Sequence, residues 1–433
     1  MRILIIGNGI AGATAARNIR MRSDHSVTMI SDESWQPFSR TALMYVYMGR
    51  LKLENTYLYE ADFWEKNGIE RILGRVIRIH PDARTVALAD GQMLPFDCLI
   101  LAAGARPKMP GLPGETLEGI QGLYHLHDLE MLERRTPEIT RAVLVGGGLI
   151  GVELAEMLHA RGIPVTFLVR ESSFWNTALP PEESDLINRH LREYGIDLRL
   201  ETSVQAFVGD ENGRVRAAAT TAGETIPCNF VGLTVGVRPN IAFLRDSGIE
   251  CAQGVLADEF LETNRPGIFA IGDCAELRRP SPGRKAIEAI WYAGRKMGET
   301  VAATVCGEKT AYQPGLWFNS AKFFDIEYQA YGEAPAQIPP SIACLHWEHP
   351  GGKKSIRIYF ERAGGAVTGF LLLGIRYRQA VCEKWIQEKT SIETVLPRLS
   401  AANFDPEFSR QYEGELAKRY ARFEATTGRL RKF

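Results

Sequence analysis

The sequence lacks closely spaced cysteines. Its seven cysteines stand at positions 98, 228, 251, 274, 306, 344 and 382, and no two of them form a CxxC pair. A disulfide framework or a structural zinc site would need cysteines or histidines in close groups. His346 and His349 are three residues apart, but Pro350 follows them and no cysteine or carboxylate pattern accompanies them. We therefore expect neither disulfides nor a metal.

The sequence also lacks an excess of charge of one sign and a long apolar run. Lysine and arginine number 51, against 52 aspartates and glutamates, so no global field attracts nucleic acid or an anionic membrane surface. The first apolar run, Ile3–Ile6, ends at Gly7 and is too short for a signal peptide or a membrane span. We expect a cytoplasmic protein with no nucleic-acid or membrane partner.

What the chain does contain is one pattern that occurs twice. In the first copy, residues 2–6 predict a buried parallel strand, Gly7-Asn8-Gly9-Ile10-Ala11-Gly12 follows, and an alanine-rich helix is expected over 13–19. In a GxGxxG turn the first glycine makes the tight turn, the second lets the backbone approach a pyrophosphate, and the third lets the helix pack on the strand. The N-terminus of the helix then offers free N–H donors to the phosphates.

The second copy has a strand over 142–145, the turn Gly146-Gly147-Gly148-Leu149-Ile150-Gly151, and a helix over 152–161. A single GxGxxG is weak evidence, because a glycine-rich turn can be purely structural. Two copies in the same strand and helix context predict two dinucleotide-binding sites.

The residues after the next strand of each copy are expected to contact the adenosine ribose. After the strand at 27–30 these are Asp32 and Glu33, which can accept from ribose hydroxyls, as FAD requires. After the strand at 165–168 they are Arg170 and Glu171. Arg170 favours the 2′-phosphate of NADPH, whereas Glu171 also suits NADH. Alternatively, Arg170 is only a solvated charge at a strand end.

Three further segments resemble motifs of the FAD-dependent pyridine nucleotide disulfide oxidoreductase superfamily. Residues 99–107 (LILAAGARP) resemble its ATGxxP segment, residues 235–240 (VGVRPN) its GxxPN segment, and residues 263–273 (TNRPGIFAIGD) its second FAD motif. The resemblance covers roughly the first three quarters of the chain. It implies that Asp273 accepts hydrogen bonds from the ribityl chain of FAD. Taken alone, Gly-Asp after an apolar run equally predicts a helix N-cap.

The redox cysteines of the superfamily's disulfide reductases are missing. The chain has neither CxxxxC nor CxxC, and no cysteine lies in Pro37–Leu43, where coenzyme A disulfide reductases carry one. This implies a branch similar to the NAD(P)H-dependent ferredoxin and rubredoxin reductases. The stretch resembles their YSRPxLSK pattern, which implies that Arg40 pairs with the FAD pyrophosphate. Tyr45 replaces the lysine that in relatives pairs with a glutamate, here Glu153, so Glu153 has a different role or only packs its helix.

The motif order implies an α/β protein with two nested Rossmann-like dinucleotide-binding domains and an α+β C-terminal interface domain, as its length also suggests. We expect an FAD-binding domain of residues 1–113 and 242–310, interrupted by an NAD(P)-binding domain of residues 114–241. Residues 311–433 would form the C-terminal domain, which in the family helps to build a homodimer.

Within the C-terminal part, strands are expected over 355–360 and 367–373 and a helix over 378–389. The aromatic residues Trp317, Phe318, Phe323 and Phe324 either cover the flavin or pack in a core. The basic tail either docks an acidic redox protein or is a solvated helical face; its residues are Arg419, Arg422, Arg429, Arg431 and Lys432, with Arg376 and Arg378 nearby.

The resemblance implies an enzyme in which NAD(P)H gives a hydride to FAD and electrons pass to an external acceptor such as ferredoxin or rubredoxin. Two alternatives stay open: an NAD(P)H oxidase or diaphorase acting on oxygen or quinone, and a regulatory flavoprotein resembling apoptosis-inducing factor, which Tyr45 favours. Glu153 and Trp291 are implied to lie nearest the flavin. The residues expected to bind FAD are Gly7, Gly9, Ile10, Ala11, Gly12, Asp32, Glu33, Arg40, Val76, Ala103, Gly104, Gly272 and Asp273. Those expected to bind NADPH or NADH are Gly146, Gly148, Leu149, Ile150, Gly151, Arg170, Glu171 and Gly236.

Overall fold

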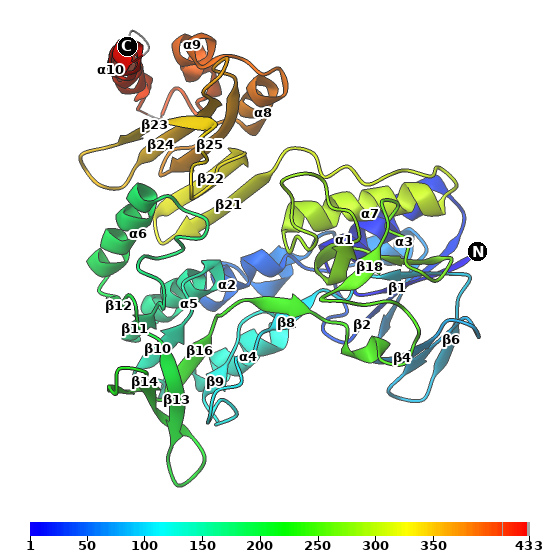
Figure 1. Ribbon diagram of the computed structural model, residues 1–433. Helices are drawn as coiled ribbons and strands as arrows, with labels where there is room; N and C mark the ends of the chain where they lie inside the picture. Colours follow the sequence, from blue (N-terminus) through cyan, green and yellow to red (C-terminus); the bar gives the residue numbers. More distant parts are fainter. Residues whose placement is uncertain (409, 431–433) are drawn as a thin grey trace. The chain divides into compact units, whose positions relative to one another are not determined.

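The chain folds into two compact units (Figure 1). This computed structural model describes residues 1–408 and 410–430, with side chains described as far as residue 422. The first unit contains Met1–Thr140, Glu211–Val215 and Asn229–Pro314, and the second contains Arg141–Asp210, Arg216–Cys228 and the chain from Gly315 onward. The two glycine-rich turns therefore lie in different units.

The core of the first unit is a five-stranded parallel sheet. Its strand before the glycine-rich turn is central, because the order across the sheet is β19-β7-β1-β2-β3. The strands β1, β7 and β19 are almost continuously apolar, as expected for parallel strands covered on both faces, whereas the edge strand β3 contains Glu70 and Arg71. The bounds of the five strands are β1 (Arg2–Ile6), β2 (Ser26–Ser31), β3 (Ile69–Leu73), β7 (Cys98–Leu101) and β19 (Ile268–Ala270).

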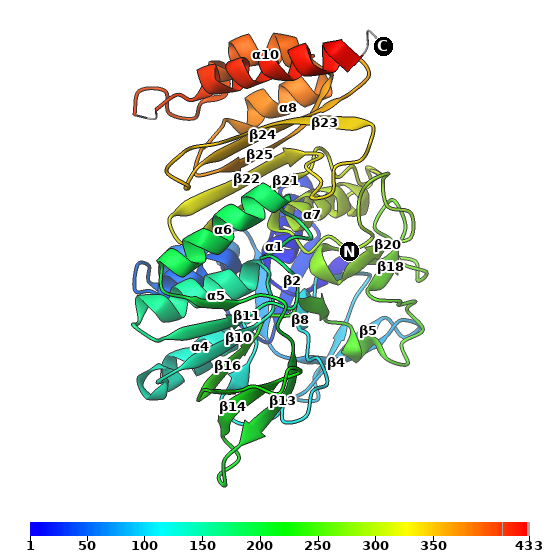
Figure 2. The same ribbon diagram turned by 60° about the vertical axis from the view of Figure 1, so that its left-hand side comes forward.

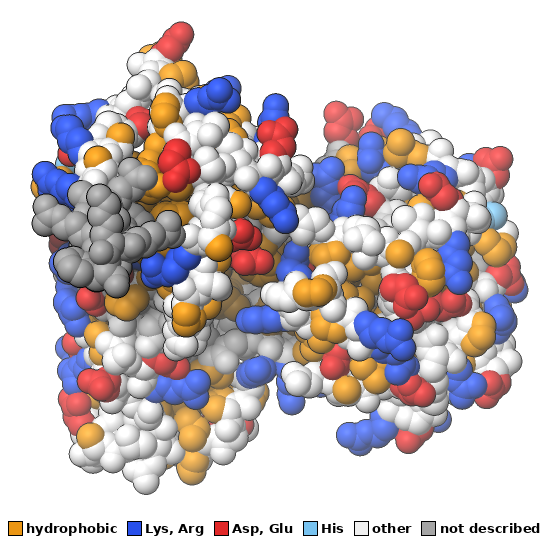
Figure 3. All heavy atoms as spheres, turned by 45° about the horizontal axis from the view of Figure 1, so that its top comes forward, with side chains coloured by type: hydrophobic (Ala, Val, Ile, Leu, Met, Phe, Trp, Pro, Cys, Tyr) orange, Lys and Arg blue, Asp and Glu red, His pale blue; other side chains and the backbone are white. Residues whose placement is uncertain are grey.

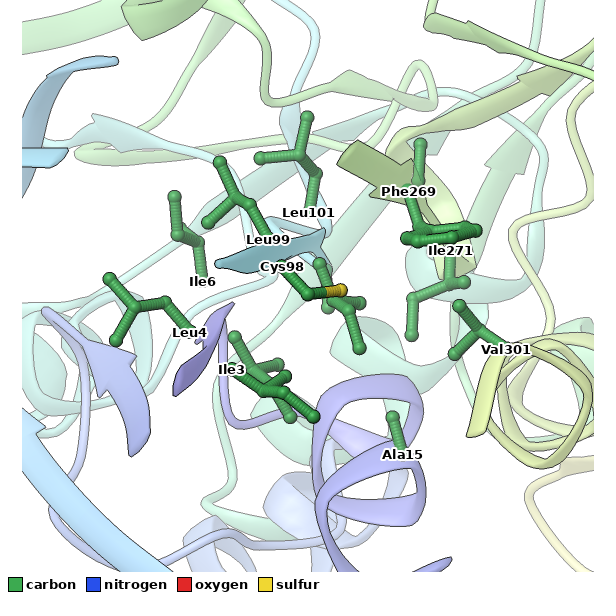
Figure 4. Packing of buried hydrophobic residues seen from close by; sticks show 14 of the residues in the cluster. Ile3, Leu4, Ile6, Ala15, Cys98, Leu99, Leu101, Phe269, Ile271 and Val301 are labelled. Carbon is green, nitrogen blue, oxygen red and sulfur yellow. The ribbon is translucent and has the colours of Figure 1, made fainter. Parts of the chain in front are cut away.

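Two helices, α1 (Ile10–Arg22) and α7 (Trp291–Val305), pack against each other and against this sheet. Figure 4 shows Ala15 of α1 and Val301 of α7 beside apolar side chains of β1, β7 and β19. The helices approach closely because small residues line their contact. A Cβ atom on Gly298 would lie only 2.6 Å from the carbonyl oxygen of Ala11.

The remaining elements of the first unit are short. The two segments that resemble family motifs at 99–107 and 235–240 lie side by side, because β8 (Ala105–Pro107) pairs antiparallel with β17 (Val237–Pro239). The others are the antiparallel sheet of β4 (Val76–His80), β5 (Thr85–Leu88) and β6 (Met93–Pro95), the parallel pairs β9 (Ile120–Gln121) with β16 (Phe230–Leu233) and β18 (Val255–Ala257) with β20 (Ala275–Leu277), and the helices α2 (Leu43–Tyr47), α3 (Phe63–Lys66) and α4 (Leu126–Arg135).

The second unit begins with another strand, turn and helix. Its parallel strands β12-β11-β10 and the helix α5 repeat the arrangement of β1, β2 and α1. The bounds are β10 (Ala142–Val145), α5 (Leu149–Ala160), β11 (Val165–Leu168), α6 (Pro181–Glu193) and β12 (Asp197–Arg199), followed by a three-stranded sheet of β13 (Val204–Gly209), β14 (Val215–Thr220) and β15 (Thr225–Pro227).

The C-terminal part of the second unit is an antiparallel sheet of order β21-β22-β25-β24-β23. Figure 2 shows α8 and α10 on one side of this sheet, where Trp385 and Leu416 join its core. On its other side, Arg357 of β24 donates to Glu183 of α6 at 3.0 and 2.9 Å. The bounds are β21 (Phe318–Phe323), β22 (Ile326–Gly332), β23 (Ile342–Glu348), β24 (Ser355–Glu361), β25 (Val367–Leu373), α8 (Gln379–Gln387), α9 (Ile392–Val395) and α10 (Glu413–Leu430).

The predicted fold class is confirmed: two Rossmann-like parts and an α+β C-terminal part are present. The helices after both glycine-rich turns begin earlier than predicted, at Ile10 and Leu149, because the last residues of each turn are already helical. Among the aromatic residues, Phe323 packs against Phe174, 5.9 Å between ring centroids, and Phe324 stacks on Tyr194 at 4.3 Å. For these two residues the structure shows packing within the second unit.

Charged side chains of both signs are mixed on the face shown in Figure 3. In the tail, Arg419 donates to the carbonyl of His346, while Arg431, Lys432 and the side chain of Arg429 lie outside the described residues. No helix in the described chain is long and apolar enough to cross a membrane. The described residues also contain no group of three or more histidine, cysteine, aspartate or glutamate side chains placed to hold a metal ion.

The α1–α7 contact yields a stability prediction. Gly298→Ala should lower the free energy of unfolding by about 1 to 3 kcal/mol, because the added methyl group is forced against the Ala11 carbonyl. Gly414→Ala in α10 is the matched control, since its Cβ meets no described atom within 4 Å and alanine favours helix. Thermal unfolding of the two variants measures the difference. Equal stability of Gly298→Ala and the wild type would contradict this packing.

Candidate functional site

The first glycine-rich turn contains glycines that serve two different purposes. Gly7 has a φ of 105°, and a Cβ there would lie 2.1 Å from the carbonyl oxygen of Ala102. A Cβ on Gly12 would lie 2.0 Å from the carbonyl oxygen of Gly7. At Gly9, by contrast, a Cβ would meet no described atom within 4 Å. Gly7 and Gly12 are therefore required by the fold, whereas the open space at Gly9 is what a pyrophosphate needs to approach the backbone.

Three segments converge on this turn. The start of α1 meets the turn at Gly272, where a Cβ would lie 2.9 Å from Cβ of Ala11. It also meets the first turn of α7, where a Cβ on Gly294 would lie 3.5 Å from the Ile10 side chain. The half-buried Trp291 is the first residue of α7. Ile10, Ala11, Gly272 and Trp291 thus lie on elements that meet around one place. Ala103 and Gly104, which follow β7, lie beside Asn240, whose N–H donates to Gly104 at 3.0 Å.

Asp273 is not a helix N-cap. It lies inside a single 3-10 turn, Gly272–Cys274, and its Oδ2 accepts a hydrogen bond from the hydroxyl of Tyr124 at 2.8 Å. Burial raises the pKa of Asp273, while the Tyr124 hydrogen bond and the charge of Arg40 lower it. No described residue donates a hydrogen bond to Oδ1, so one oxygen of this carboxylate is available to a ligand.

Glu33 and Arg40, which were assigned to the ribose and the pyrophosphate, are paired with each other. Two Arg40 nitrogens lie 2.7 Å from the two carboxylate oxygens of Glu33. Glu33 also accepts from the N–H of Leu126 at 2.7 Å. Burial raises the pKa of Glu33, but the hydrogen bonds from Arg40 and His125 outweigh it and hold that pKa below its usual range. Asp32 is exposed at the end of β2.

Tyr124 is the residue that sequence reasoning missed. It lies between β9 and α4, outside every recognised motif, yet its ring stacks under the Arg40 guanidinium at 4.5 Å and its hydroxyl contacts Asp273. The only local signal is the run from His125 to Asp128 that begins α4. That run predicts a helix start but no contact to residues far away in the sequence.

In the second glycine-rich turn, the glycine at the place of Gly9 is again open, and the crowded glycine is Gly147, at the place of Asn8. A Cβ on Gly147 would lie 2.7 Å from Val169, whereas a Cβ on Gly148 would meet no described atom within 4 Å. Leu149, Ile150 and Gly151 form the first turn of α5. After β11, Nε of the largely exposed Arg170 donates to Glu171 at 2.6 Å. The two residues expected to select the nicotinamide cofactor are therefore paired with each other.

Glu153 lies one turn into α5. Burial, with a smaller contribution from Glu156, raises the pKa of Glu153 to about 7. Glu156 accepts a hydrogen bond from Lys322 of β21 at 2.7 Å. Glu153 is therefore a carboxyl group that can hold a proton near neutral pH.

Two assigned residues stand apart from these groups. Val76 is half-buried at the start of β4. Gly236, assigned to NAD(P), belongs to the first unit, has a φ of 103°, and its carbonyl accepts from Lys108 at 3.0 Å. The other NAD(P) residues belong to the second unit.

The cysteine adjacent to Asp273 is not placed for redox chemistry. Cys274 is buried, with its sulfur 3.4 Å from the carbonyl oxygens of Leu101 and Ile271. Burial raises the pKa of its thiol to about 12. A buried thiol that stays protonated is a poor nucleophile. All seven cysteines are free thiols.

Comparison with known proteins identifies the family. The model described as pyridine nucleotide-disulphide oxidoreductase matches residues 1–298. The chain belongs to this family. The resemblance inferred from the sequence is thereby confirmed, and the chain is an FAD-dependent NAD(P)H oxidoreductase.

Within the pyridine nucleotide-disulphide oxidoreductases, the chain is 31% identical over 308 residues to the ferredoxin reductase component of chlorobenzene dioxygenase from Cupriavidus sp. (strain PS12), covering 71% of this chain and 74% of that one. It is 30% identical over 328 residues to rhodocoxin reductase of Rhodococcus erythropolis, covering 75% and 76%. In fold it is similar to the ferredoxin reductase for the CYP199A2 system from Rhodopseudomonas palustris, with 23% identity, a TM-score of 0.79, and coverage of 94% and 98%.

The first unit fits the FAD that this family uses. Gly9 leaves space for a pyrophosphate at the N-terminus of α1, where free N–H groups attract phosphate. A half-buried carboxylate, Asp273, keeps one oxygen available beside the same convergence of elements. Both features match FAD, in which the pyrophosphate is followed directly by the hydroxyl groups of the ribityl chain.

The contrast between Gly9 and Gly12 is testable. Gly9→Val should abolish FAD binding, because the added side chain occupies only the cofactor's space. The variant should nevertheless unfold at the same temperature as wild-type protein from which FAD has been removed. Gly12→Val, the matched control, should lower the unfolding temperature as well, because its Cβ collides with Gly7. Flavin absorption and circular dichroism report the two effects. A yellow Gly9→Val protein would contradict the assignment.

Proposed function

We propose that this enzyme passes electrons from NADPH or NADH, through FAD, to a ferredoxin- or rubredoxin-type carrier protein without a redox-active disulfide. The observation that carries the proposal is the match over 71% of the chain to a protein named as a ferredoxin reductase component. The buried Cys274 thiol supports it, since the cysteine nearest Asp273 is unsuited to a thiol relay. The lack of closely spaced cysteines in the sequence suits the cytoplasm, where we place the reaction.

We assign FAD to residues 1–113 and 242–310, the nicotinamide cofactor to residues 114–241, and a role in forming a homodimer to residues 311–433. The pyrophosphate of FAD is held at Gly9, Ile10 and Ala11, and its ribityl chain by Asp273. The nicotinamide cofactor is held by Gly148 and the start of α5, with Arg170 and Glu171 at its adenosine end.

When bound, FAD supplies the chemistry: it accepts a hydride from NAD(P)H and releases electrons one at a time to a carrier. The protein's part is to bind and orient. We assign Trp291, at the start of α7, and Glu153, on α5, to the vicinity of the flavin. The raised pKa of Glu153 allows its carboxyl group to hold or release a proton near pH 7.

The acceptor is tested by following the flavin after rapid mixing without oxygen. NADPH or NADH should bleach the flavin absorption within one turnover, and an added ferredoxin should restore it at least about tenfold faster than dissolved oxygen does, because a matched protein surface speeds electron transfer. The matched control is the Gly9→Val protein, which should show no flavin signal. If oxygen or a quinone restores the absorption faster than any ferredoxin or rubredoxin, an oxidase or diaphorase replaces this proposal.

The choice between NADPH and NADH is tested at the Arg170–Glu171 pair. Arg170→Ala should weaken NADPH use about tenfold to a hundredfold and change NADH use little, because a charge-assisted contact to the 2′-phosphate is lost. Glu171→Ala should improve NADPH use, since it removes a competing carboxylate 2.6 Å from Arg170. The measurement is kcat/KM for both cofactors. Equal effects of Arg170→Ala on the two cofactors would show that Arg170 is a solvated strand-end charge.

A further inference from the structure

Tyr124 is held through every polar group it has. Its N–H donates to Asp128 at 2.8 Å, and its carbonyl oxygen accepts from Arg40. Its hydroxyl accepts from the N–H of Ala105 at 3.1 Å and donates to Asp273 at 2.8 Å. A side chain with this many constraints has one position, so its hydroxyl is a fixed donor to the Asp273 carboxylate.

Tyr124 also lies between two groups of the residues assigned to FAD. On one side its ring lies under Arg40, which forms the two-point ion pair with Glu33. On the other side its hydroxyl contacts Asp273 and lies 3.2 Å from the Cβ position of Gly104. Arg40, Gly104 and Asp273 come from three separate parts of the sequence, and Tyr124 lies beside all three. Glu33 is linked to Tyr124 through its ion pair with Arg40.

We propose that Tyr124 is a positioning residue of the FAD site, whose hydroxyl holds Oδ2 of Asp273 so that Oδ1 serves as a charged acceptor for FAD. This role rests on the assignment of Asp273 to FAD. Tyr124 itself touches Asp273, Arg40 and Ala105, and it acts on the cofactor through them.

The electrostatics of Asp273 explain why it needs such a partner. Burial raises the pKa of Asp273, and only the Tyr124 hydrogen bond and the Arg40 charge lower it. Burial and the nearby Asp273 raise the pKa of the Tyr124 hydroxyl, so it keeps its proton and remains a donor. Without that hydroxyl, burial is opposed by Arg40 alone, and the carboxylate takes up a proton at a higher pH.

Other charged groups near this turn do not take part. The elements packed against Gly272–Cys274 are α1, α7 and β17. None of the titratable residues on these elements contributes to the pKa shift of Asp273; they are Arg17, Arg20 and Arg22 on α1, Tyr292, Arg295, Lys296 and Glu299 on α7, and Arg238 on β17. Cys274, the next residue, is buried and keeps its proton.

The test is the pH dependence of FAD binding to the full chain, measured by flavin fluorescence after FAD has been removed and added back. Tyr124→Phe keeps the ring under Arg40 and removes only the hydroxyl. We expect its FAD dissociation constant to approach the wild-type value near pH 8.5 and to exceed it by about tenfold near pH 5.5, because affinity falls up to tenfold per pH unit below the pKa of a carboxylate that must be ionised. Asp273→Asn should bind FAD weakly at every pH.

Two controls separate this role from simple packing. Tyr59→Phe, in the same unit but with its ring against Phe63, should keep the wild-type profile. In the Asp273→Asn background, Tyr124→Phe should have no pH-dependent effect. A Tyr124→Phe profile parallel to that of the wild type, whether shifted or not, overturns the positioning role. Wild-type FAD affinity in Asp273→Asn overturns the assignment of Asp273 itself, and the role of Tyr124 with it.

Discussion

The close passage of backbone over backbone at the first glycine-rich turn is the constraint on which the first unit depends. The carbonyl of Ala102, just after β7, lies where a Cβ of Gly7 would stand. The carbonyl of Gly7 lies where a Cβ of Gly12 would stand. This lets α1 start directly above the central strand, and it brings the end of β7 beside the turn. The N-terminus of α1 is thereby fixed next to Gly272 and α7, and the open space at Gly9 follows from that arrangement.

Around this turn the protein buries charged groups and satisfies them in pairs. Glu33 is matched by Arg40, and Asp273 by the Tyr124 hydroxyl, because an unpaired buried charge costs several kcal/mol. Arg40 also contacts Tyr124, so the two pairs are linked by one set of contacts. A substitution in the Glu33–Arg40 pair is therefore expected to affect the Tyr124–Asp273 pair as well.

The second unit also pairs a buried charged side chain, here an arginine with two glutamates. Arg357 is buried between β24 and α6, where it meets Glu183 and Glu182. Aromatic contacts join the start of the C-terminal sheet to the segments on either side of α6: Phe323 packs against Phe174, and Phe324 against Tyr194. Phe174 lies four residues after Arg170, so the loop that carries the expected cofactor-selecting residues is packed against the C-terminal sheet. Arg170 and Glu171 themselves stay near the surface, where they pair with each other.

The sequence alone determined the two Rossmann-like parts and the family, because a GxGxxG turn is set by spacing along a single stretch of chain. The strands at 142–145, 165–168 and 367–373 were also predicted within a residue, since continuous apolar runs mark buried strands. Only the tertiary structure decided which charges meet. Tyr124 and Asp273 are 149 residues apart and Glu33 and Leu126 are 93 apart. No local pattern records such pairs, because hydrogen bonds over that separation depend on how the strands, turns and helices between them pack.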